Sequence, residues 1–241
     1  MNEYGLRQIG VIRSPYKEKF AVPRQPGLVE DGTGELSLLP PYNQPDAVRG
    51  LEAFSHIWVL FVFHQTLAQG WRPTVRPPRL GGNARVGVFA TRSTFRPNPI
   101  GMSLIALRGI RISGTQVTLE LGSLDLVDGT PVVDIKPYLP YAESIPSARA
   151  GFAQQGPTAS MTVGFCAAAE MRLAELVPHY PRLRQFISDL LAQDPRPAYH
   201  QRQDSERIYA VALLEFTVRW RVNGPVAEVL AIDPVGQMNH P

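Results

Sequence analysis

The chain has 241 residues, of which 44% are hydrophobic, enough to bury a substantial core in one or two domains. Its net charge of +3 and pI of about 9.2 permit RNA as a partner without the strong basicity of a nucleic-acid-binding tail. No apolar run approaches the length of a membrane-spanning helix, and the first residues lack the charged and apolar regions of a secretory signal. Cys166 is the single cysteine, which excludes an intrachain disulfide and fits a reducing cytoplasm.

The first part of the chain alternates short strand-like runs with glycine and proline. We expect strands at residues 6–12, 34–38, 56–63, 85–89, 104–112 and 116–121. The turn dipeptide Ser113-Gly114 predicts a hairpin between the last two. The strands do not alternate with helices, and no Gly-x-Gly-x-x-Gly motif is present. This pattern favours a closed or nearly closed barrel over a Rossmann sheet.

The character of the chain changes near residue 160. Residues 167–176 and 181–193 have helical patterns, 207–222 resembles one long strand, and 226–232 a returning strand. Residues 146–160, rich in glycine and proline, look like a linker. The expected fold is mainly β: a small β-barrel domain over residues 1–148, followed by a small α+β domain over 160–241.

The loop at residues 90–103 is the strongest functional signal. Pro97 and Pro99 fix their own backbone angles and restrict the residues before them, Arg96 and Asn98. With Arg92, the loop presents two guanidinium groups and one amide on a stiff backbone, as suits a polar ligand. The alternative is a proline-rich turn with solvated arginines.

Four other segments carry polar groups near the ends of strands. They are residues 23–27 (Pro-Arg-Gln-Pro-Gly), His64-Gln65, residues 122–125 with the turn at 128–130, and residues 134–141. In the last segment Asp134, Lys136 and Tyr138 alternate, so an extended backbone places them on one face. Each segment also has a plain structural interpretation: a solvated arm, a strand cap, a turn or a surface ion pair. Together they predict one shared pocket at a barrel rim.

Several enzyme classes lack their motifs. The histidines show no metal-ligand spacing, and one cysteine cannot build a zinc cluster. Neither a phosphate-binding Gly-x-x-x-x-Gly-Lys-Ser/Thr loop nor a Gly-x-Ser-x-Gly nucleophile elbow is present.

Four stretches in the same order resemble the TrmO (YaeB-like) family of tRNA methyltransferases, which act on the threonylcarbamoyladenosine beside the anticodon. They are residues 9–16 (Ile-Gly-Val-Ile-Arg-Ser-Pro-Tyr), 87–101, 128–138 and 194–199. Within them Arg-Pro-Asn-Pro-Ile-Gly at residues 96–101 is highly specific. The resemblance implies an S-adenosylmethionine-dependent tRNA (adenine-N6)-methyltransferase on an unusual β-barrel. It also implies a homodimer that holds the cofactor near the subunit interface. From the cysteine count and the histidine spacing, we expect a cytoplasmic protein without a metal.

The resemblance further implies a cofactor site. Its residues are Pro23, Arg24, Gln25, His64, Gln65, Arg92, Met102, Gly122, Ser123, Leu124 and Asp125. Met102 stands where leucine is more often expected, a change that conserves size.

A hypothesis for the mechanism assigns the catalytic residues. Asp134 is the candidate base for the proton on N6, the nitrogen at position 37 that receives the methyl group. Lys136 or Arg96 stabilises the carbamoyl oxygen or holds the threonyl carboxylate. Tyr138 or Tyr141 stacks on the base, and Asn98 orients a polar group.

Arginines are frequent in the C-terminal part, at positions 182, 184, 196, 202, 207, 219 and 221. They predict contacts with tRNA phosphates, the alternative being a scattered solvated surface. Two other functions stay open: a non-catalytic RNA-binding module, and an S-adenosylmethionine-dependent methyltransferase with another acceptor.

Overall fold

A computed structural model of the chain describes residues 2–81, 83–197 and 207–236. Its internal contacts divide the chain into two compact units. The first unit lies within Met1–Arg13, Gly34–Gly122 and Gly129–Gln155, and the second within Ser14–Thr33, Ser123–Asp128 and Gly156–Pro241. The second unit therefore combines the C-terminal part with two short segments from earlier in the chain.

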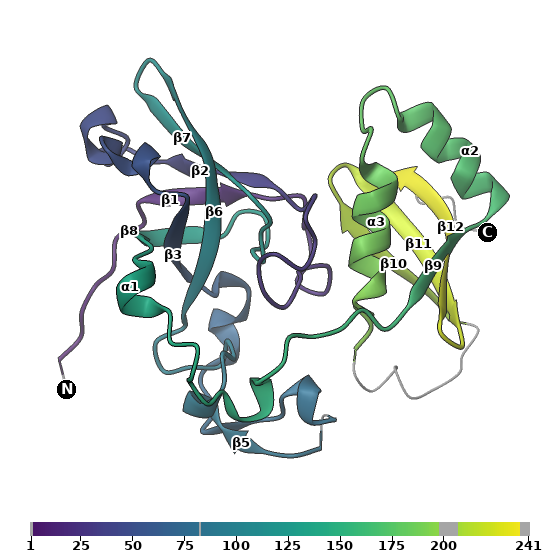
Figure 1. Cartoon of the computed structure of the whole chain (residues 1–241), viewed down its shortest axis with the longest axis horizontal. Helices are drawn as coiled ribbons and strands as arrows, with labels where there is room; N and C mark the ends of the chain where they lie inside the picture. The colour runs from purple at the N-terminus through teal and green to yellow at the C-terminus, as the bar shows by residue number, and fades with distance from the viewer. Residues whose placement is uncertain (1, 82, 198–206, 237–241) are drawn as a thin grey trace. The chain divides into compact units, whose positions relative to one another are not determined.

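Among the described residues, six strands of the first unit close into a barrel in the order β1-β2-β7-β6-β3-β8 (Figure 1). They are β1 (Gly10–Arg13), β2 (Gly34–Leu38), β3 (His56–Val62), β6 (Ile100–Ser113), β7 (Gln116–Leu121) and β8 (Pro131–Pro137). The barrel closes because β8 pairs with both β3 and β1, where Gly10 lies opposite Val132. The predicted mainly β fold with a barrel is confirmed.

The side chains of β3 show how the barrel separates core from surface. Ile57, Val59 and Phe61 are buried in the barrel. Trp58 and Leu60 alternate with them and are only partly buried, because successive side chains of a strand point to opposite faces. The outer wall at β3 is thus apolar and half-exposed.

Three strands differ from their predicted limits. The first begins at Gly10 rather than residue 6. The strand expected at 104–112 is the longer β6, because Ile100 and the residues after it pair with β3. The strand expected at 85–89 is only β5 (Val86–Gly87), which pairs with β4 (Thr74–Val75) and runs into the 3-10 turn η5 (Val88–Ala90).

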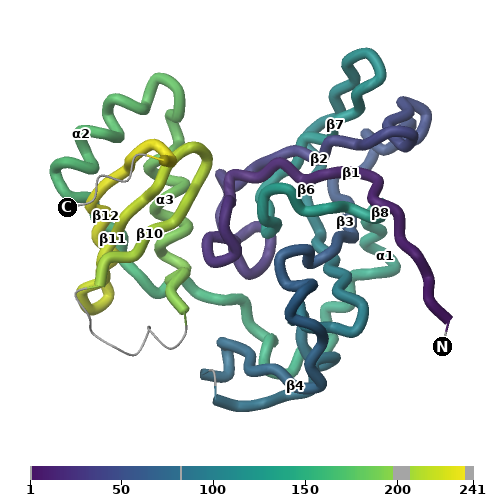
Figure 2. Tube along the Cα trace, turned by 180° about the vertical axis from the view of Figure 1, so that it is seen from behind, coloured from purple at the N-terminus to yellow at the C-terminus, as the bar shows by residue number. Residues whose placement is uncertain are grey.

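Short helical turns lie between and after the strands of the first unit. They are η1 (Pro45–Val48), η2 (Leu51–Ala53), η3 (His64–Gln69), η4 (Pro78–Leu80), α1 (Pro140–Glu143) and η6 (Gly151–Ala153). The predicted hairpin at Ser113-Gly114 is confirmed, with Gly114 at a φ of 59°. The β6–β7 hairpin extends outward from the barrel in both views (Figures 1 and 2).

The described part of the second unit contains a sheet of four strands in the order β10-β11-β12-β9. They are β9 (Thr162–Phe165), β10 (Ile208–Leu213), β11 (Phe216–Asn223) and β12 (Val226–Pro234), with helices α2 (Ala167–Leu176) and α3 (Leu183–Ala192). The predicted α+β character is confirmed. The single strand expected over 207–222 is wrong: Leu214, at a φ of 55°, lies in a turn between β10 and β11.

The core of this unit lies between α3 and the sheet. The buried residues of α3 include Phe186, Ile187 and Leu190. Figure 1 shows α3 in front of the strands, and Figure 2, from behind, shows the strands in front. On β10 and β11, Tyr209 stacks on Trp220 with ring centroids 5.6 Å apart. Nowhere in the described residues is there a helix with the length and hydropathy to span a membrane.

Candidate active site

The loop between η5 and β6 is stabilised by its own hydroxyl groups. Thr91 Oγ1 donates to the carbonyl of Val88 (2.8 Å) and accepts the backbone N–H of Ser93 (3.1 Å). Ser93 Oγ in turn accepts the N–H of Phe95 (3.3 Å). Such local bonds between side chains and the backbone stabilise the turn in addition to the restraint that the prolines impose.

Arg96 turns back onto this loop. Its Nη1 donates to the carbonyls of Thr91 (2.7 Å) and Val88 (3.3 Å), and its guanidinium lies 5.6 Å from the centroid of the Phe89 ring. Arg96 therefore holds the loop in shape, a role that the sequence did not suggest. Arg92 and Asn98 are exposed.

A row of three residues crosses the outer wall of the barrel. Leu60 on β3 pairs with Met102 on β6 and with Asp134 on β8. At a strand spacing of roughly 4.8 Å, the backbones of Met102 and Asp134 are about 10 Å apart. Met102 is 48% exposed and the Asp134 side chain 46%. A predicted cofactor residue and the predicted base thus share an open face of the wall, whereas the sequence suggested a pocket at the rim.

Asp134 lies beside Lys136 on this face. Asp134 Oδ2 is 3.0 Å from Lys136 Nζ, and Asp134 Oδ1 accepts the backbone N–H of Ile135 (2.9 Å). Lys136 pairs across the strands with Trp58, whose ring meets Tyr138 edge-on at 6.3 Å. The face therefore combines a carboxylate, an ammonium group and two aromatic rings.

Three other predicted cofactor residues of the first unit follow strands. His64 and Gln65 open η3 directly after β3, and Phe63 N–H donates to the carbonyl of Pro99 (2.9 Å), which ties this point to the loop. Gly122 follows β7, and a Cβ there would lie 3.0 Å from the Cβ of Ala106. A larger residue at position 122 would crowd β6.

The remaining predicted cofactor residues lie in the second unit, in two segments that are bonded together. Ser123 Oγ accepts the N–H of Gly27 (2.9 Å) and donates to the carbonyl of Val29 (2.7 Å). Leu124 N–H donates to the carbonyl of Gly32 (2.8 Å). These bonds bring residues 23–25 and 123–125 into one unit.

The exposure of these residues limits how they can act. Pro23 and Leu124 are buried, and Leu124 has no exposed surface with which to contact a ligand. Arg24 is exposed, and Gln25 and Asp125 are partly exposed. The polar side chains that can reach a ligand are therefore Arg24, Gln25 and Asp125.

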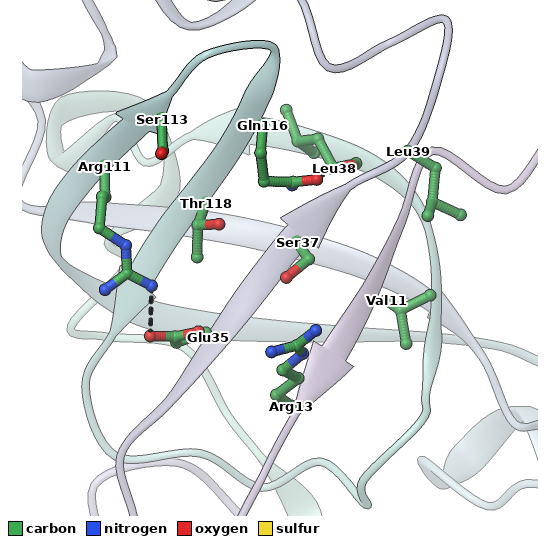
Figure 3. Close-up of a pocket in the computed structure, with 10 residues that line it drawn as sticks. All are labelled: Val11, Arg13, Glu35, Ser37, Leu38, Leu39, Arg111, Ser113, Gln116 and Thr118. Atoms are coloured by element: carbon green, nitrogen blue, oxygen red, sulfur yellow. Dashed lines mark hydrogen bonds and ion pairs between the residues drawn. The ribbon is translucent and has the colours of Figure 1, made fainter.

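A hollow of about 490 Å³ lies elsewhere on the barrel, lined by β1, β2, β6, β7 and the residue after β2 (Figure 3). None of the predicted site residues lines it. Its Arg111 is ion-paired with Glu35 at 2.7 Å and with Glu120 at 3.6 Å. These two carboxylates neutralise the charge of Arg111, while Arg13 also lines the hollow.

Most arginines of the C-terminal part are already paired. Within the second unit the partners are Asp31 for Arg182, Glu170 for Arg184, Asp194 for Arg196, Asp233 for Arg219 and Glu228 for Arg221. Position 202 lies outside the described residues. Residues 156–241 hold eight arginines, no lysine and nine carboxylates, a net charge of −1. The predicted phosphate contacts stay a prediction, and the ion pairs reduce the charge available for them.

The chain matches two domain families in sequence. Residues 11–144 match the tRNA-methyltransferase O N-terminal domain, and residues 158–235 match the TrmO C-terminal domain. This chain belongs to the TrmO family. The resemblance drawn from the motifs is confirmed.

Similar proteins support this placement along the whole length. The tRNA (adenine(37)-N6)-methyltransferase of Escherichia coli K12 is 65% identical over 234 residues, 97% of this chain and 100% of that protein. A putative S-adenosylmethionine-dependent methyltransferase of Pseudomonas aeruginosa, RcsF, is 47% identical over 92% of this chain and 94% of its own length. The crystal structure of TrmO from Pseudomonas aeruginosa superposes with a TM-score of 0.77 at 39% identity, over 96% of this chain and 98% of that one.

Sequence reasoning missed Asp31 and Gly32, and it assigned Arg182 to tRNA phosphates and not to the support of the site segments. Asp31, Gly32 and Arg182 stabilise the segment at residues 14–33, yet none of them lies in a recognisable motif. Asp31 and Arg182 are far apart in the chain, so no local pattern connects them. No three His, Cys, Asp or Glu side chains in the described ranges are arranged to hold a metal ion.

Proposed function

We propose that this chain transfers the methyl group of S-adenosylmethionine to N6 of threonylcarbamoyladenosine at position 37 of tRNA. The row of Met102, Leu60 and Asp134 carries the proposal, because it places a predicted cofactor residue beside the predicted base. Membership of the TrmO family and the similarity to the tRNA (adenine(37)-N6)-methyltransferase of E. coli support the reaction. The proposal also includes a division into two domains: a methyltransferase domain over residues 1–148 and a small α+β domain over residues 160–241.

The exposed side chains fit the chemistry of the cofactor. S-adenosylmethionine carries a carboxylate, an ammonium group, ribose hydroxyls and a flat base. Arg24 and Arg92 are exposed guanidinium groups suited to a carboxylate, and Asp125 suits the ammonium group or a ribose hydroxyl. Met102 supplies an exposed, polarisable apolar surface.

When bound, the cofactor supplies an electrophilic methyl group on a sulfonium. N6 lies between an aromatic ring and a carbonyl, so its proton is acidic enough for a modest base. Asp134 accepts this proton as the methyl group is transferred. Lys136, 3.0 Å from Asp134, stabilises negative charge on the carbamoyl oxygen or holds the threonyl carboxylate. Positioning of the two reactants supplies most of the acceleration.

Other residues orient the tRNA base. Tyr138, on the same surface as Trp58, offers a ring for stacking. Asn98 is exposed on the loop and presents an amide for hydrogen bonds. Arg96 acts mainly through the shape of the loop, since its Nη1 is bonded to two loop carbonyls.

The protein acts as a cytoplasmic homodimer in this proposal. Large apolar side chains of the first unit are exposed, among them Phe89 (74%), Trp71 (57%) and Leu67 (52%). Exposed apolar surface of this kind favours burial by a partner. Light scattering behind size-exclusion chromatography measures the mass, and a monomer at micromolar concentration contradicts this part.

Methyl transfer from labelled S-adenosylmethionine to bulk tRNA tests the function. Matched tRNA pools come from cells with and without the threonylcarbamoyl modification. Label in the modified pool alone is the expected result. Label in both pools indicates another acceptor. If the cofactor binds but no methyl group is transferred to either pool, the proposed acceptor is contradicted. If the cofactor does not bind at all, the remaining interpretation is a non-catalytic RNA-binding module.

A further inference from the structure

Residues 14–33, which carry Arg24 and Gln25, begin as an addition to the C-terminal sheet. Tyr16 forms an antiparallel bridge with Leu213 on β10, the edge strand of the sheet. Leu214 N–H donates to the carbonyl of Pro15 (2.8 Å), and Glu18 Oε1 accepts the N–H of Ala212 (3.2 Å). The start of the segment thus covers the open edge of β10.

The ring of Tyr16 joins the two ends of this segment to α3. Tyr16 has no exposed surface, and its ring centroid lies 5.8 Å from that of Phe186 on α3. A Cβ at Gly32 would lie 1.9 Å from the Tyr16 hydroxyl oxygen, so only glycine fits there. Gly32, near the end of the segment, therefore packs directly against Tyr16, which anchors the beginning of the segment.

An ion pair holds the same end. Arg182, just before α3, places Nε 2.5 Å from Asp31 Oδ1. The Asp31 side chain is only 15% exposed, and its Oδ2 is buried with no hydrogen-bond partner in the described structure. Arg182 is therefore the cation that compensates this carboxylate, and its loss leaves a buried charge uncompensated.

The second cofactor segment depends on the first. Ser123 and Leu124 are bonded to Gly27, Val29 and Gly32, all within residues 14–33. A displacement of residues 27–32 therefore also disturbs the backbone of residues 123–125.

We propose that Arg182 and Phe186 of the C-terminal part position both cofactor segments, so that this part of the chain tunes affinity for S-adenosylmethionine. Arg182 is a positioning residue that acts through Asp31. The proposal rests on the proposed cofactor role of Arg24 and Gln25. It assigns Arg182 a role that is independent of tRNA.

The test measures S-adenosylmethionine binding by calorimetry in the full chain without tRNA. Arg182→Ala is expected to weaken binding about tenfold, and to raise the KM for the cofactor while kcat at saturation stays near wild type. Asp31→Asn removes the same ion pair but leaves no buried charge, so we expect it to weaken binding less, and the double variant to be no worse than Arg182→Ala. Arg182→Lys, which keeps the charge, is expected to recover part of the affinity.

Arg172→Ala is the matched control, because it removes an arginine paired with Glu175 on α2, away from both segments. Wild-type cofactor affinity in both Arg182→Ala and Asp31→Asn overturns the proposal. A raised KM for tRNA alone assigns Arg182 to phosphate binding instead. Arg24→Ala separates the two proposals: if it also leaves cofactor affinity unchanged, the cofactor role of the segment itself fails.

Discussion

Gly101 faces the ring of Phe61 across the pairing of β6 with β3, and a Cβ at this glycine would lie 2.3 Å from the ring. The last residue of the Arg-Pro-Asn-Pro-Ile-Gly element is therefore glycine for a packing reason. Without a side chain, β6 can pass over a large aromatic residue of the barrel core. The loop that precedes Gly101 is placed by this contact.

Gly101→Ala is expected to destabilise the barrel by about 1–3 kcal/mol, because the added methyl group overlaps buried ring atoms. Chemical denaturation followed by fluorescence measures the loss. Gly87→Ala is the control, since a Cβ there meets nothing within 4 Å. Phe61→Leu is expected to restore part of the stability of Gly101→Ala, and a double variant no better than the single one contradicts the steric explanation.

Asp134→Asn removes the candidate base with little change of shape. We expect kcat to fall by about 10²–10⁴, the usual contribution of a general base. Cofactor affinity, measured by calorimetry, stays near wild type because Asp134 is not among the cofactor residues. Asp46→Asn, at an exposed ion pair with Arg49, is the control. Unchanged turnover in Asp134→Asn removes this residue from the mechanism.

Arg92→Ala tests the cofactor role of the loop. We expect the affinity for S-adenosylmethionine to fall about tenfold, equivalent to about 1.4 kcal/mol. Calorimetric titration measures the change, with circular dichroism to check folding. An affinity equal to that of the wild type would exclude Arg92 from the cofactor site.

Arg96→Ala is expected to act through the loop rather than through one ligand. Loss of the Nη1 bonds to Val88 and Thr91 loosens the backbone around Arg92. Both the cofactor KM and kcat then worsen, and limited proteolysis cuts the loop faster. If only kcat changes and proteolysis does not, Arg96 contacts the reacting groups instead.

The buried Tyr16 makes the folding stability of the second unit depend on pH in the alkaline range. Burial raises the pKa of Tyr16 above its ordinary value of 10.0, and the nearby Asp125 carboxylate raises it further. Above about pH 10 the unfolded chain releases this proton and the folded chain keeps it. Stability therefore falls as pH rises, by about 1.4 kcal/mol per pH unit for this group, until the folded pKa is reached.

Tyr16→Phe should remove the part of the pH dependence of stability that Tyr16 contributes. Denaturation of the variant and of wild type at several pH values between 9 and 11 measures the difference. At pH 7 the variant should be within about 1 kcal/mol of wild type or more stable, because the hydroxyl is buried without a hydrogen-bond partner in the described structure. Identical slopes for the two proteins would contradict the burial argument.

Local patterns in the sequence determined much of the fold. Strict alternation predicted residues 116–121 as a strand, and helix-forming residue types predicted a helix at residues 167–176, both as the structure has them. The strand over 207–222 was wrong because Leu214-Glu215 has none of the usual turn residues. The tight loop between β10 and β11 depends on packing of Phe216 in the core, which no local signal reports.

The sequence by itself determined the family, through the motif that ends at Gly101, and the candidate residues of the site. Only the tertiary structure decided that Met102 and Asp134 share one outer face, because strand register sets which distant residues become neighbours. It also decided that Asp31 meets Arg182. Such contacts come from the packing of whole elements, and short-range periodicity carries no information about them.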